Sequence, residues 1–399
     1  MAGPLQGVRI LDLTSMISGP VTTMMLADQG ADVIKVENPR GGDFTRAVST
    51  RREGFSATYI NNNRNKRSIA LNLKDPRGVE TLKRLAQDCD VMVQNFRPGV
   101  VDRMGIGEAD IRTVAPSIIY VSISGFGKDG PYAQKPVYDP LVQALSGLTT
   151  VQAGSDEVRP RLVRTILPDK LTGYAGAQAI TAALFARERT GEGQHITLSM
   201  LDTVIAFLWN SDMGAHTFVG DELKKETSQS FNDLIYETGD GYISVAVQSD
   251  KEWAGLARVV DKPEWLEDPR FANAALRHKN IDARLELTQE VLRNDTTASW
   301  LERLEAEDVP CAPVLKRREM IHHPQVVAND MIVESDHPVA GRVRQARLAP
   351  RFSGTPSPTP HPAPGLGDDT VSILGDAGFS ADEIDALISD GVAVAGRTS

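Results

Sequence analysis

Residues 8–37, VRILDLTSMISGPVTTMMLADQGADVIKVE, decide the fold of the first half of the chain. Two short runs rich in Val, Ile and Leu, Val8–Leu13 and Asp32–Glu37, have the length and pattern of strands. The segment between them, Val21–Gln29, has the length and spacing of a helix. A strand, a helix and a strand in this order predict a βαβ unit with two parallel strands.

The same alternation continues beyond residue 37. Further strands are expected at Arg67–Leu73, at Asp90–Asn95 and in the run that ends at Ile123, with helices at Asp75–Cys89 and Lys170–Arg189 and a strand at Gln194–Ser199. This order predicts an α/β fold with a doubly wound, mainly parallel, Rossmann-like sheet. Because such sheets bind ligands beyond the carboxyl ends of their strands, the candidate site comprises the segments after Leu13, Glu37, Leu73, Asn95 and Ser124.

The length of 399 residues exceeds what one core usually supports, so two domains are expected. We assign residues 1–215 to a large domain, 216–232 to a polar linker and 233–319 to a smaller α+β domain with a strand at Gly241–Val247. Helices are expected there near Asp250–Val260 and Ile281–Leu304. Residues 320–399 return to the large domain through a proline-rich connector at 354–364, and a capping box at Ser380 starts a C-terminal helix.

Composition restricts the classes of function. Hydrophobic residues make up 41% and charged residues 24%, and no apolar run approaches the roughly eighteen residues of a bilayer span. With no signal peptide visible, we expect a cytoplasmic protein without a membrane partner. The net charge of −10 argues against nucleic acid but permits local basic pockets for a phosphorylated small molecule. Cys89 and Cys311 are read as two buried reduced thiols, and the histidine spacing predicts no metal site.

The stretch Ser124–Pro131, SGFGKDGP, contains G-x-G-x-x-G after a predicted strand. A dinucleotide-binding loop would lead from its third glycine straight into a helix. Pro136 would interrupt such a helix by removing a hydrogen bond and clashing with the preceding turn. The glycines are therefore expected to permit a turn and not to hold a pyrophosphate.

Seven segments match a single pattern, namely Gly7–Thr14 with Gly19-Pro20, Asn65–Ser68 with Leu73-Lys74, Val93–Gly99 (VQNFRPG), Ser124–Pro131, Arg189–Gln194, Gly239–Tyr242 and Val309–Val314 (VPCAPV). Together they resemble the class III CoA-transferases, the family of formyl-CoA transferase and carnitine CoA-transferase, which also includes the α-methylacyl-CoA racemases. The resemblance covers nearly the whole chain. It implies an interlocked homodimer, in which each chain threads through a ring formed by the other, and an aspartate nucleophile.

Asp169, in Leu167–Lys170, stands where the resemblance places that nucleophile. Read without the family, Asp169 would be the N-cap of the following helix. As a nucleophile it would attack a thioester to give a mixed anhydride, and CoA thiolate would then form an aspartyl-CoA thioester that an acceptor acid reverses. The helix dipole is expected to keep the carboxylate ionised. The substrates are an acyl-CoA and a carboxylic acid, and no cofactor is expected beyond coenzyme A as substrate.

The resemblance also implies CoA contacts at Leu71, Lys74, Asn95, Phe96 and Arg103. Lys74 and Arg103 suit phosphates, although each read alone is a solvated surface cation. The chain departs from formyl-CoA transferase at Ser15, Ile17 and Asn38, so formyl-CoA and oxalate are disfavoured as substrates. In that enzyme a run of glycines in the second domain covers the site. The corresponding stretch here, 228–233 (SQSFND), has no such run.

Tyr138 distinguishes two activities within the resemblance. The racemases have a histidine at this position, because moving an α-proton between faces needs a base on each side. Tyrosine, with a pKa of about 10, is a poor base, so a transferase is favoured over a racemase or epimerase, and a silent CoA-binding relative is the third hypothesis. Tyr138 itself is either a catalytic group or a packed aromatic. Arg159, Arg161 and Arg164 either pair with the distal carboxylate of a dicarboxylic acid such as succinate or are solvated.

Overall fold

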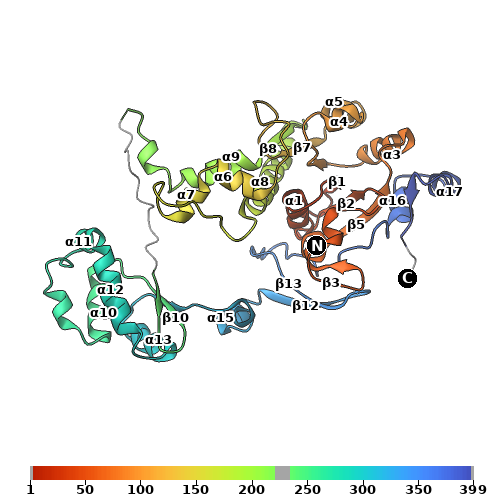
Figure 1. The fold of residues 1–399 in the computed structure, drawn as a ribbon. Helices are drawn as coiled ribbons and strands as arrows, with labels where there is room; N and C mark the ends of the chain where they lie inside the picture. Colours follow the sequence, from red (N-terminus) through yellow and green to blue (C-terminus); the bar gives the residue numbers. More distant parts are fainter. Residues whose placement is uncertain (1–2, 221–233, 397–399) are drawn as a thin grey trace. The chain divides into compact units, whose positions relative to one another are not determined.

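The computed structural model describes residues 3–220 and 234–396. The chain forms two compact units (Figure 1), one made of Met1–Thr227 with Asp330–Ser399 and the other of Ser228–Asn329. Each unit is described by itself below. No helix of the described residues is long and apolar enough to cross a membrane.

The first unit is built around a seven-stranded sheet in the order β14-β5-β2-β1-β6-β7-β8. Its strands are parallel except β14, which is antiparallel to β5; the bounds are β1 Arg9–Asp12, β2 Asp32–Glu37, β5 Lys66–Leu71, β6 Val91–Gln94, β7 Ile119–Ser124, β8 His195–Ser199 and β14 Ala393–Val394. This confirms the predicted α/β class and the mainly parallel sheet. After β1 the chain adds β2 and β5 on one side and β6, β7 and β8 on the other, so the strand order reverses between β1 and β6. Ligands bind in the crevice at such a reversal.

Adjacent side chains of each inner strand enter different cores. Leu11 packs in one apolar cluster and Ile10 in the other, as the two-residue period of a strand requires. The first cluster includes residues of α3 Pro76–Ala86, α4 Val100–Arg103, α5 Glu108–Arg112, α16 Thr370–Asp376 and α17 Ala381–Ser389, and the second includes residues of α1 Ser18–Ala27 and α8 Leu167–Thr190. The predicted capping box is confirmed, since Ser380 and Glu383 exchange side-chain and backbone hydrogen bonds.

Small residues allow α1 and α8 to approach closely. A Cβ built on Gly173 would lie 2.6 Å from Val21 Cγ1, and one on Gly176 would lie 2.6 Å from Thr22 Oγ1. Thr22 Oγ1 donates a hydrogen bond to the Gly173 carbonyl at 3.1 Å. Glycine at these two positions therefore lets the second and third turns of α8 pack closely against α1.

The remaining elements of the first unit are short helices, 3-10 turns and two small hairpins. They are α2 Ala57–Asn63, α6 Asp139–Leu145, α7 Leu148–Ala153, α9 Met200–Trp209, the 3-10 turns η1 Phe44–Ala47 and η2 Gly214–His216, and the pairs β3 Arg51–Arg52 with β4 Phe55–Ser56 and β12 Ile332–His337 with β13 Gly341–Ala346. Residues 354–364 form no helix or strand, as expected of the connector. Gly127 and Gly130 have positive φ, and the next helix starts only at Asp139, which confirms a turn in place of a dinucleotide-binding loop.

The second unit has its own core around three tryptophans, Trp253, Trp265 and Trp300. Its elements are the antiparallel sheet of β9 Ile235–Glu237, β10 Tyr242–Val245 and β11 Cys311–Pro313, the helices α10 Asp250–Val259, α11 Ala274–Lys279, α12 Ile281–Leu292, α13 Thr297–Ala306, α14 Arg317–Met320 and α15 Pro324–Ala328, and the turn η3 Pro263–Leu266. The expectation of one helix over Ile281–Leu304 is wrong, because the Thr296 side chain caps a new helix by accepting from Ser299 N–H. Cys89 is buried as predicted, whereas Cys311 is only partly buried.

Candidate active site

A cavity of about 260 Å³ lies beyond the carboxyl ends of β1, β6 and β7. Its walls come from the segments after these strands, from the start of α6 and from the first turn of α8; the lining includes Ser15, Met16, Ser18, Asn95, Phe96, Gly125, Phe126, Lys135, Tyr138, Asp139, Asp169 and Met200. It therefore opens at the reversal between β1 and β6, where an open α/β sheet binds ligands. Three of the five segments that topology suggested contribute to it, those after Leu13, Asn95 and Ser124.

Asp169 is the third residue of α8 and not its N-cap, which is Ile166. The helix begins three residues earlier than predicted because Pro168 is tolerated in a first turn, where its missing N–H has no helical partner to lose. Asp169 Oδ1 accepts a hydrogen bond of 3.3 Å from Ser18 N–H, at the first residue of α1. The two helix N-termini thus meet at this carboxylate.

The surroundings make Asp169 a weaker acid than usual. Burial, and after it the nearby Asp139 carboxylate, raise the pKa of Asp169 to about 6, while the hydrogen bond from Ser18 lowers it. Burial also raises the pKa of Asp139, although hydrogen bonds from Gln143 and from Asp169 N–H oppose that shift. The sequence argument from the helix dipole alone missed these two larger effects. Asp169 remains largely ionised at pH 7, with less hydration than a surface carboxylate.

Asn95 holds the loop that follows β1. Its Oδ1 accepts from Ser15 N–H at 3.0 Å, and its Nδ2 donates to the Ser15 carbonyl at 2.8 Å. The next residue, Met16, has a φ of 70°, which is uncommon for a side chain of this kind, and its N–H donates to Asp43 Oδ1 at 3.2 Å. The loop wall of the cavity is therefore fixed from both sides.

A buried group of charges lies beneath the same loop. Lys35 Nζ donates to the Thr14 carbonyl at 2.8 Å and pairs with Asp43 at 3.0 Å, and Lys66 pairs with Asp12 at 2.9 Å. Burial lowers the pKa of Lys66 to about 8, and its pairing with Asp12 opposes that shift. Because buried charges are tolerated only when paired and hydrogen-bonded, this group restrains the loop conformation.

The structure brings together four of the residues proposed from the sequence: Asp169, Tyr138, Asn95 and Phe96 all line the cavity. Tyr138 is the N-cap residue of α6, and its side chain is 69% exposed. The other candidates lie outside this lining: Leu71 is 1% exposed within the core, and Lys74, Arg103, Arg159, Arg161 and Arg164 are exposed. The stretch 228–233, expected to form the lid, lies outside the described residues.

Sequence reasoning missed Asp139, Ser18 and Met16 as parts of the site. The Asp139-Pro140 pair, which follows Tyr138, is a helix-start signal and would have placed a carboxylate in a first turn. The proximity of Asp139 to Asp169 depends on how α6 packs against α8, which no local pattern records. Among the described residues, no cluster of three or more acidic, histidine or cysteine side chains has the arrangement of a metal site.

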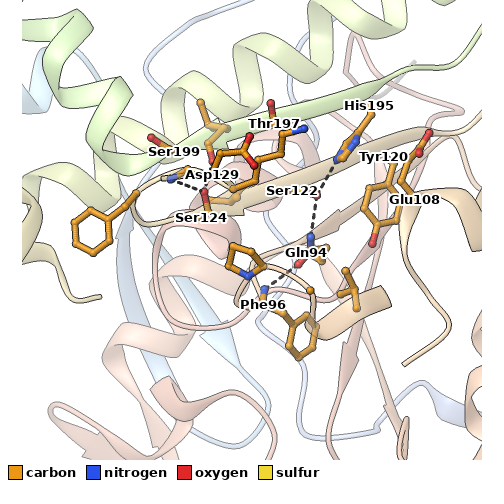
Figure 2. A pocket seen from close by; sticks show the side chains of 18 of the residues that line it. Gln94, Phe96, Glu108, Tyr120, Ser122, Ser124, Asp129, His195, Thr197 and Ser199 are labelled. Carbon is orange, nitrogen blue, oxygen red and sulfur yellow. Dashed lines mark hydrogen bonds between the residues drawn. The ribbon is translucent and has the colours of Figure 1, made fainter. Parts of the chain in front are cut away.

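A second cavity of about 460 Å³ shares Phe96, Pro98, Ile123, Ser124 and Phe126 with the first. A chain of side-chain hydrogen bonds crosses its wall (Figure 2). Phe96 N–H donates to Gln94 Oε1, Gln94 Nε2 donates to Ser122 Oγ, and Ser122 Oγ contacts His195 Nε2, each at 2.9 Å. The turn that carries Asn95 and Phe96 is therefore tied to β7 and β8 as well as to the loop after β1.

Comparison with known proteins identifies the family. The profile of CoA-transferase family III matches residues 5–370. The chain belongs to CoA-transferase family III. The resemblance inferred from the sequence motifs is thus confirmed, and the protein is an enzyme of this class.

The chain is similar to two curated CoA-transferases. The chain is 36% identical over 378 residues to succinyl-CoA:glutarate CoA-transferase from Homo sapiens, covering 93% of this chain and 85% of that protein. It is 32% identical over 416 residues to formyl-CoA:oxalate CoA-transferase from Escherichia coli O6:H1, covering 97% of this chain and 99% of that protein.

Two solved structures have the same fold as this chain. A CAIB/BAIF family protein from Brucella suis superposes with a TM-score of 0.83 at 29% identity, covering 94% of this chain and all of that one. The D175A mutant of Rv3272 from Mycobacterium tuberculosis superposes with a TM-score of 0.82 at 28% identity, covering 94% of this chain and 99% of that one.

Proposed function

We propose that this family III enzyme transfers CoA from an acyl-CoA to a carboxylic acid, with Asp169 as the nucleophile. The observation that carries the proposal is the Asp169 carboxylate in a cavity at the strand-order reversal, with a pKa raised to about 6 by burial and by Asp139. A partly desolvated carboxylate that is still ionised at neutral pH is suited to attack a thioester carbonyl. Asp139 is assigned the role of tuning that reactivity.

The reaction proceeds by two exchanges at one carboxylate. Asp169 attacks the acyl carbonyl carbon, the C–S bond breaks, and CoA leaves as a thiolate from a mixed anhydride. The thiolate then attacks the Asp169 carbonyl carbon, releasing the first acid as its carboxylate and leaving an aspartyl-CoA thioester. The acceptor carboxylate repeats these steps in reverse and leaves as the new acyl-CoA.

The Ser18 N–H is placed to assist the second step. Attack of the thiolate on the Asp169 carbonyl carbon creates an oxyanion on an Asp169 oxygen, and Oδ1 already accepts from Ser18 N–H at 3.3 Å. Ser18 lies in the first turn of α1, where backbone N–H groups lack helical partners and the helix dipole favours negative charge. We therefore assign this donor to stabilisation of the Asp169-centred intermediate.

CoA is proposed to contact the residues that the family resemblance suggested: Leu71, Lys74, Asn95, Phe96 and Arg103. Asn95 and Phe96 have the strongest support, because they line the cavity of Asp169. The exposure of Lys74 and Arg103 suits groups that meet phosphates in solvent. The core packing of Leu71 restricts its contact to the backbone.

For the acids we propose dicarboxylates, with succinyl-CoA as a first donor and glutarate as a first acceptor. The support is the similarity to the human succinyl-CoA:glutarate enzyme together with the Ser15, Ile17 and Asn38 departures from formyl-CoA transferase. The arginines at 159, 161 and 164 are exposed and are available to a distal carboxylate.

A homodimer is also proposed, interlocked as in the resembled family. Its support is a set of large apolar side chains left exposed on α6, α8 and α9: Leu141, Leu145, Tyr174, Phe185, Phe207 and Trp209. Exposed apolar surface of this extent is typical of protein–protein contacts.

The test incubates the purified protein with succinyl-CoA and a panel of free acids, and follows new acyl-CoA by mass spectrometry. We expect exchange, and with succinyl-CoA alone a CoA adduct on the peptide that contains Asp169. Asp169→Asn should show neither, whereas Asp156→Asn, an exposed carboxylate outside the cavity lining, should show both. Turnover by Asp169→Asn would refute the role of Asp169 as nucleophile. Deuterium uptake at the Cα of the acyl group would instead support a racemase. Binding of acyl-CoA without turnover would support a silent CoA-binding relative.

A further inference from the structure

The first unit contains a third cavity, of about 580 Å³, which shares no lining residue with that of Asp169. It lies among the β3–β4 hairpin, α2 and the β12–β13 hairpin. Its lining consists of Thr50, Arg51, Arg52, Phe55, Ala57, Ile60, Asn61, Glu334, Ala340, Arg342, Val343 and Arg344. The volume is within the range of small-molecule sites, about 300–1,000 Å³.

The charge of this lining is strongly positive in a chain whose net charge is −10. The lining contains four arginines and a single carboxylate, that of Glu334. That carboxylate pairs with Arg342 at 2.8 Å and with Arg344 at 2.5 Å, and the hydrogen bonds from Arg344 and Arg342 lower the pKa of Glu334. Glu334 thus orients two guanidinium groups but offsets only part of their charge, since each retains an N–H group that Glu334 does not engage.

Arg52 is oriented by neutral hydrogen-bond acceptors. Its Nη1 donates to the carbonyls of Ala340 and Arg342 at 3.1 and 3.0 Å. Carbonyl oxygens are neutral, so they orient the guanidinium while its positive charge stays uncompensated. Arg51 precedes it in the same strand and makes no ion pair with the described residues. Oriented guanidinium groups bind carboxylate or phosphate oxygens in a fixed geometry.

The floor of the cavity is apolar, and its two sides are connected. Phe55 and Val343 pack against a buried cluster that contains Tyr59 and Ile60. The two sides are joined by a buried hydrogen bond of 3.0 Å from Gln345 Nε2 to the Ile60 carbonyl. An apolar floor beneath several charged groups favours an organic anion over a simple inorganic ion.

We propose that this cavity binds a small organic polyanion, with carboxylate or phosphate oxygens on Arg51, Arg52 and Arg342 and an apolar body on Phe55. The site is separate from the proposed transfer reaction, and its ligand chemistry follows from the arginines and not from Asp169.

Isothermal titration calorimetry of the full-length protein tests this proposal. ATP and glutarate serve as the phosphate and dicarboxylate probes, and each is titrated with saturating free CoA present so that the CoA site is occupied. We expect at least one probe to bind, with the affinity about tenfold weaker in Arg51→Ala and in Arg342→Ala. Arg40→Ala, which removes an exposed arginine outside this lining, should bind like the wild type.

Both arginine variants alter exposed side chains, so circular dichroism should show an unchanged fold. Binding of ATP but not glutarate would assign a phosphate ligand, and the reverse a dicarboxylate. Absence of binding by both probes, or equal affinity in the wild type and both arginine variants, would overturn the proposal. Loss or retention of transferase activity in Asp169→Asn does not bear on this anion site, because the two cavities share no lining residue.

Discussion

The backbone N–H of Asp169 donates a hydrogen bond of 3.2 Å to Oδ2 of Asp139. The proposed nucleophile therefore lies directly beside a second carboxylate, which is itself buried and held by Gln143 Nε2 through Oδ1 at 2.6 Å. Two carboxylates this close each disfavour ionisation of the other. Their separate environments allow one to react and the other to tune it.

The first prediction concerns the pH dependence of transfer. Because Asp169 must be ionised to attack and its pKa is about 6, kcat/KM should fall as the pH decreases through about 6. Asp139→Asn removes the neighbouring charge, so the acidic limb should move to lower pH. Initial rates between about pH 4.5 and about pH 8 measure the acidic limb of the wild type and of Asp139→Asn. The control Asp156→Asn should leave the acidic limb at the pH of the wild type. If the limb also stays there in Asp139→Asn, the Asp139 charge does not influence the pKa of Asp169.

The second prediction concerns stability. In the folded chain the pKa of Asp169 is raised from its ordinary value of 3.8 to about 6, so the ionised side chain destabilises the fold above pH 6. This cost disappears as the pH falls from about 6 towards 3.8. Asp169→Asn should therefore increase the free energy of unfolding at pH 7.5 by about 1–3 kcal/mol, since one pKa unit corresponds to about 1.4 kcal/mol.

Urea unfolding of Asp169→Asn and the wild type at about pH 7.5 and about pH 5 measures this effect. The gain should be smaller at the lower pH. A gain of equal size at both values would point to packing instead of ionisation, and a loss of stability would contradict the prediction.

The sequence was sufficient for the sheet and for part of the site. Strand runs such as Asp32–Glu37 are short and contain Val and Ile, and their order with the helices determines a parallel sheet and hence the ligand-binding edge. Asp169 and Asn95 were named from motifs. The motifs do not reveal that Asn95 is the hydrogen-bond partner of the Ser15 backbone. That contact joins two loops that are 80 residues apart in sequence and meet only after folding.

The errors in the sequence predictions have physical causes. The sequence alone indicates an N-cap at Asp169 because the residues before Lys170 lack a helical pattern, although Pro168 fits a first turn. The expected helical run Ile281–Leu304 contains a break, because the polar residues 293–297, RNDTT, interrupt the apolar spacing and include the cap residue Thr296. The pKa of Asp169 followed from burial and from Asp139, which are tertiary features.

The third prediction separates two roles of Asn95. Asn95→Ala removes both hydrogen bonds to Ser15, so the loop after β1 should loosen and kcat should fall about 10- to 100-fold, at about 1.4 kcal/mol per tenfold. If Asn95 acts by positioning, the Kd for free CoA should change little. The control is Gln134→Ala, which removes an exposed hydrogen bond from the Gln134 side chain to the Pro98 carbonyl. A large rise in the CoA Kd with unchanged kcat would show direct contact.

The fourth prediction concerns the hydrogen-bond chain from Phe96 to His195. Gln94→Ala and Ser122→Ala should each lower kcat/KM by releasing the Phe96 turn, and the double variant should lose little more, because both act through one chain. A double-mutant cycle on kcat/KM measures the coupling. Thr197→Ala, in the same cavity but outside the chain, is the control. Fully additive losses would mean that the two residues act independently.

The fifth prediction tests the contact between α1 and α8. Gly173→Ala places a Cβ 2.6 Å from Val21 Cγ1 and 3.2 Å from the Ser18 carbonyl, so the helices must separate. The cost in unfolding free energy should be about 1–3 kcal/mol, as for other overpacked sites. Because Ser18 N–H and Asp169 lie at this contact, kcat should also fall. Gln178→Ala, an exposed change on the same helix, should leave kcat unchanged. Normal kcat in a destabilised Gly173→Ala would show that the helix spacing serves stability alone.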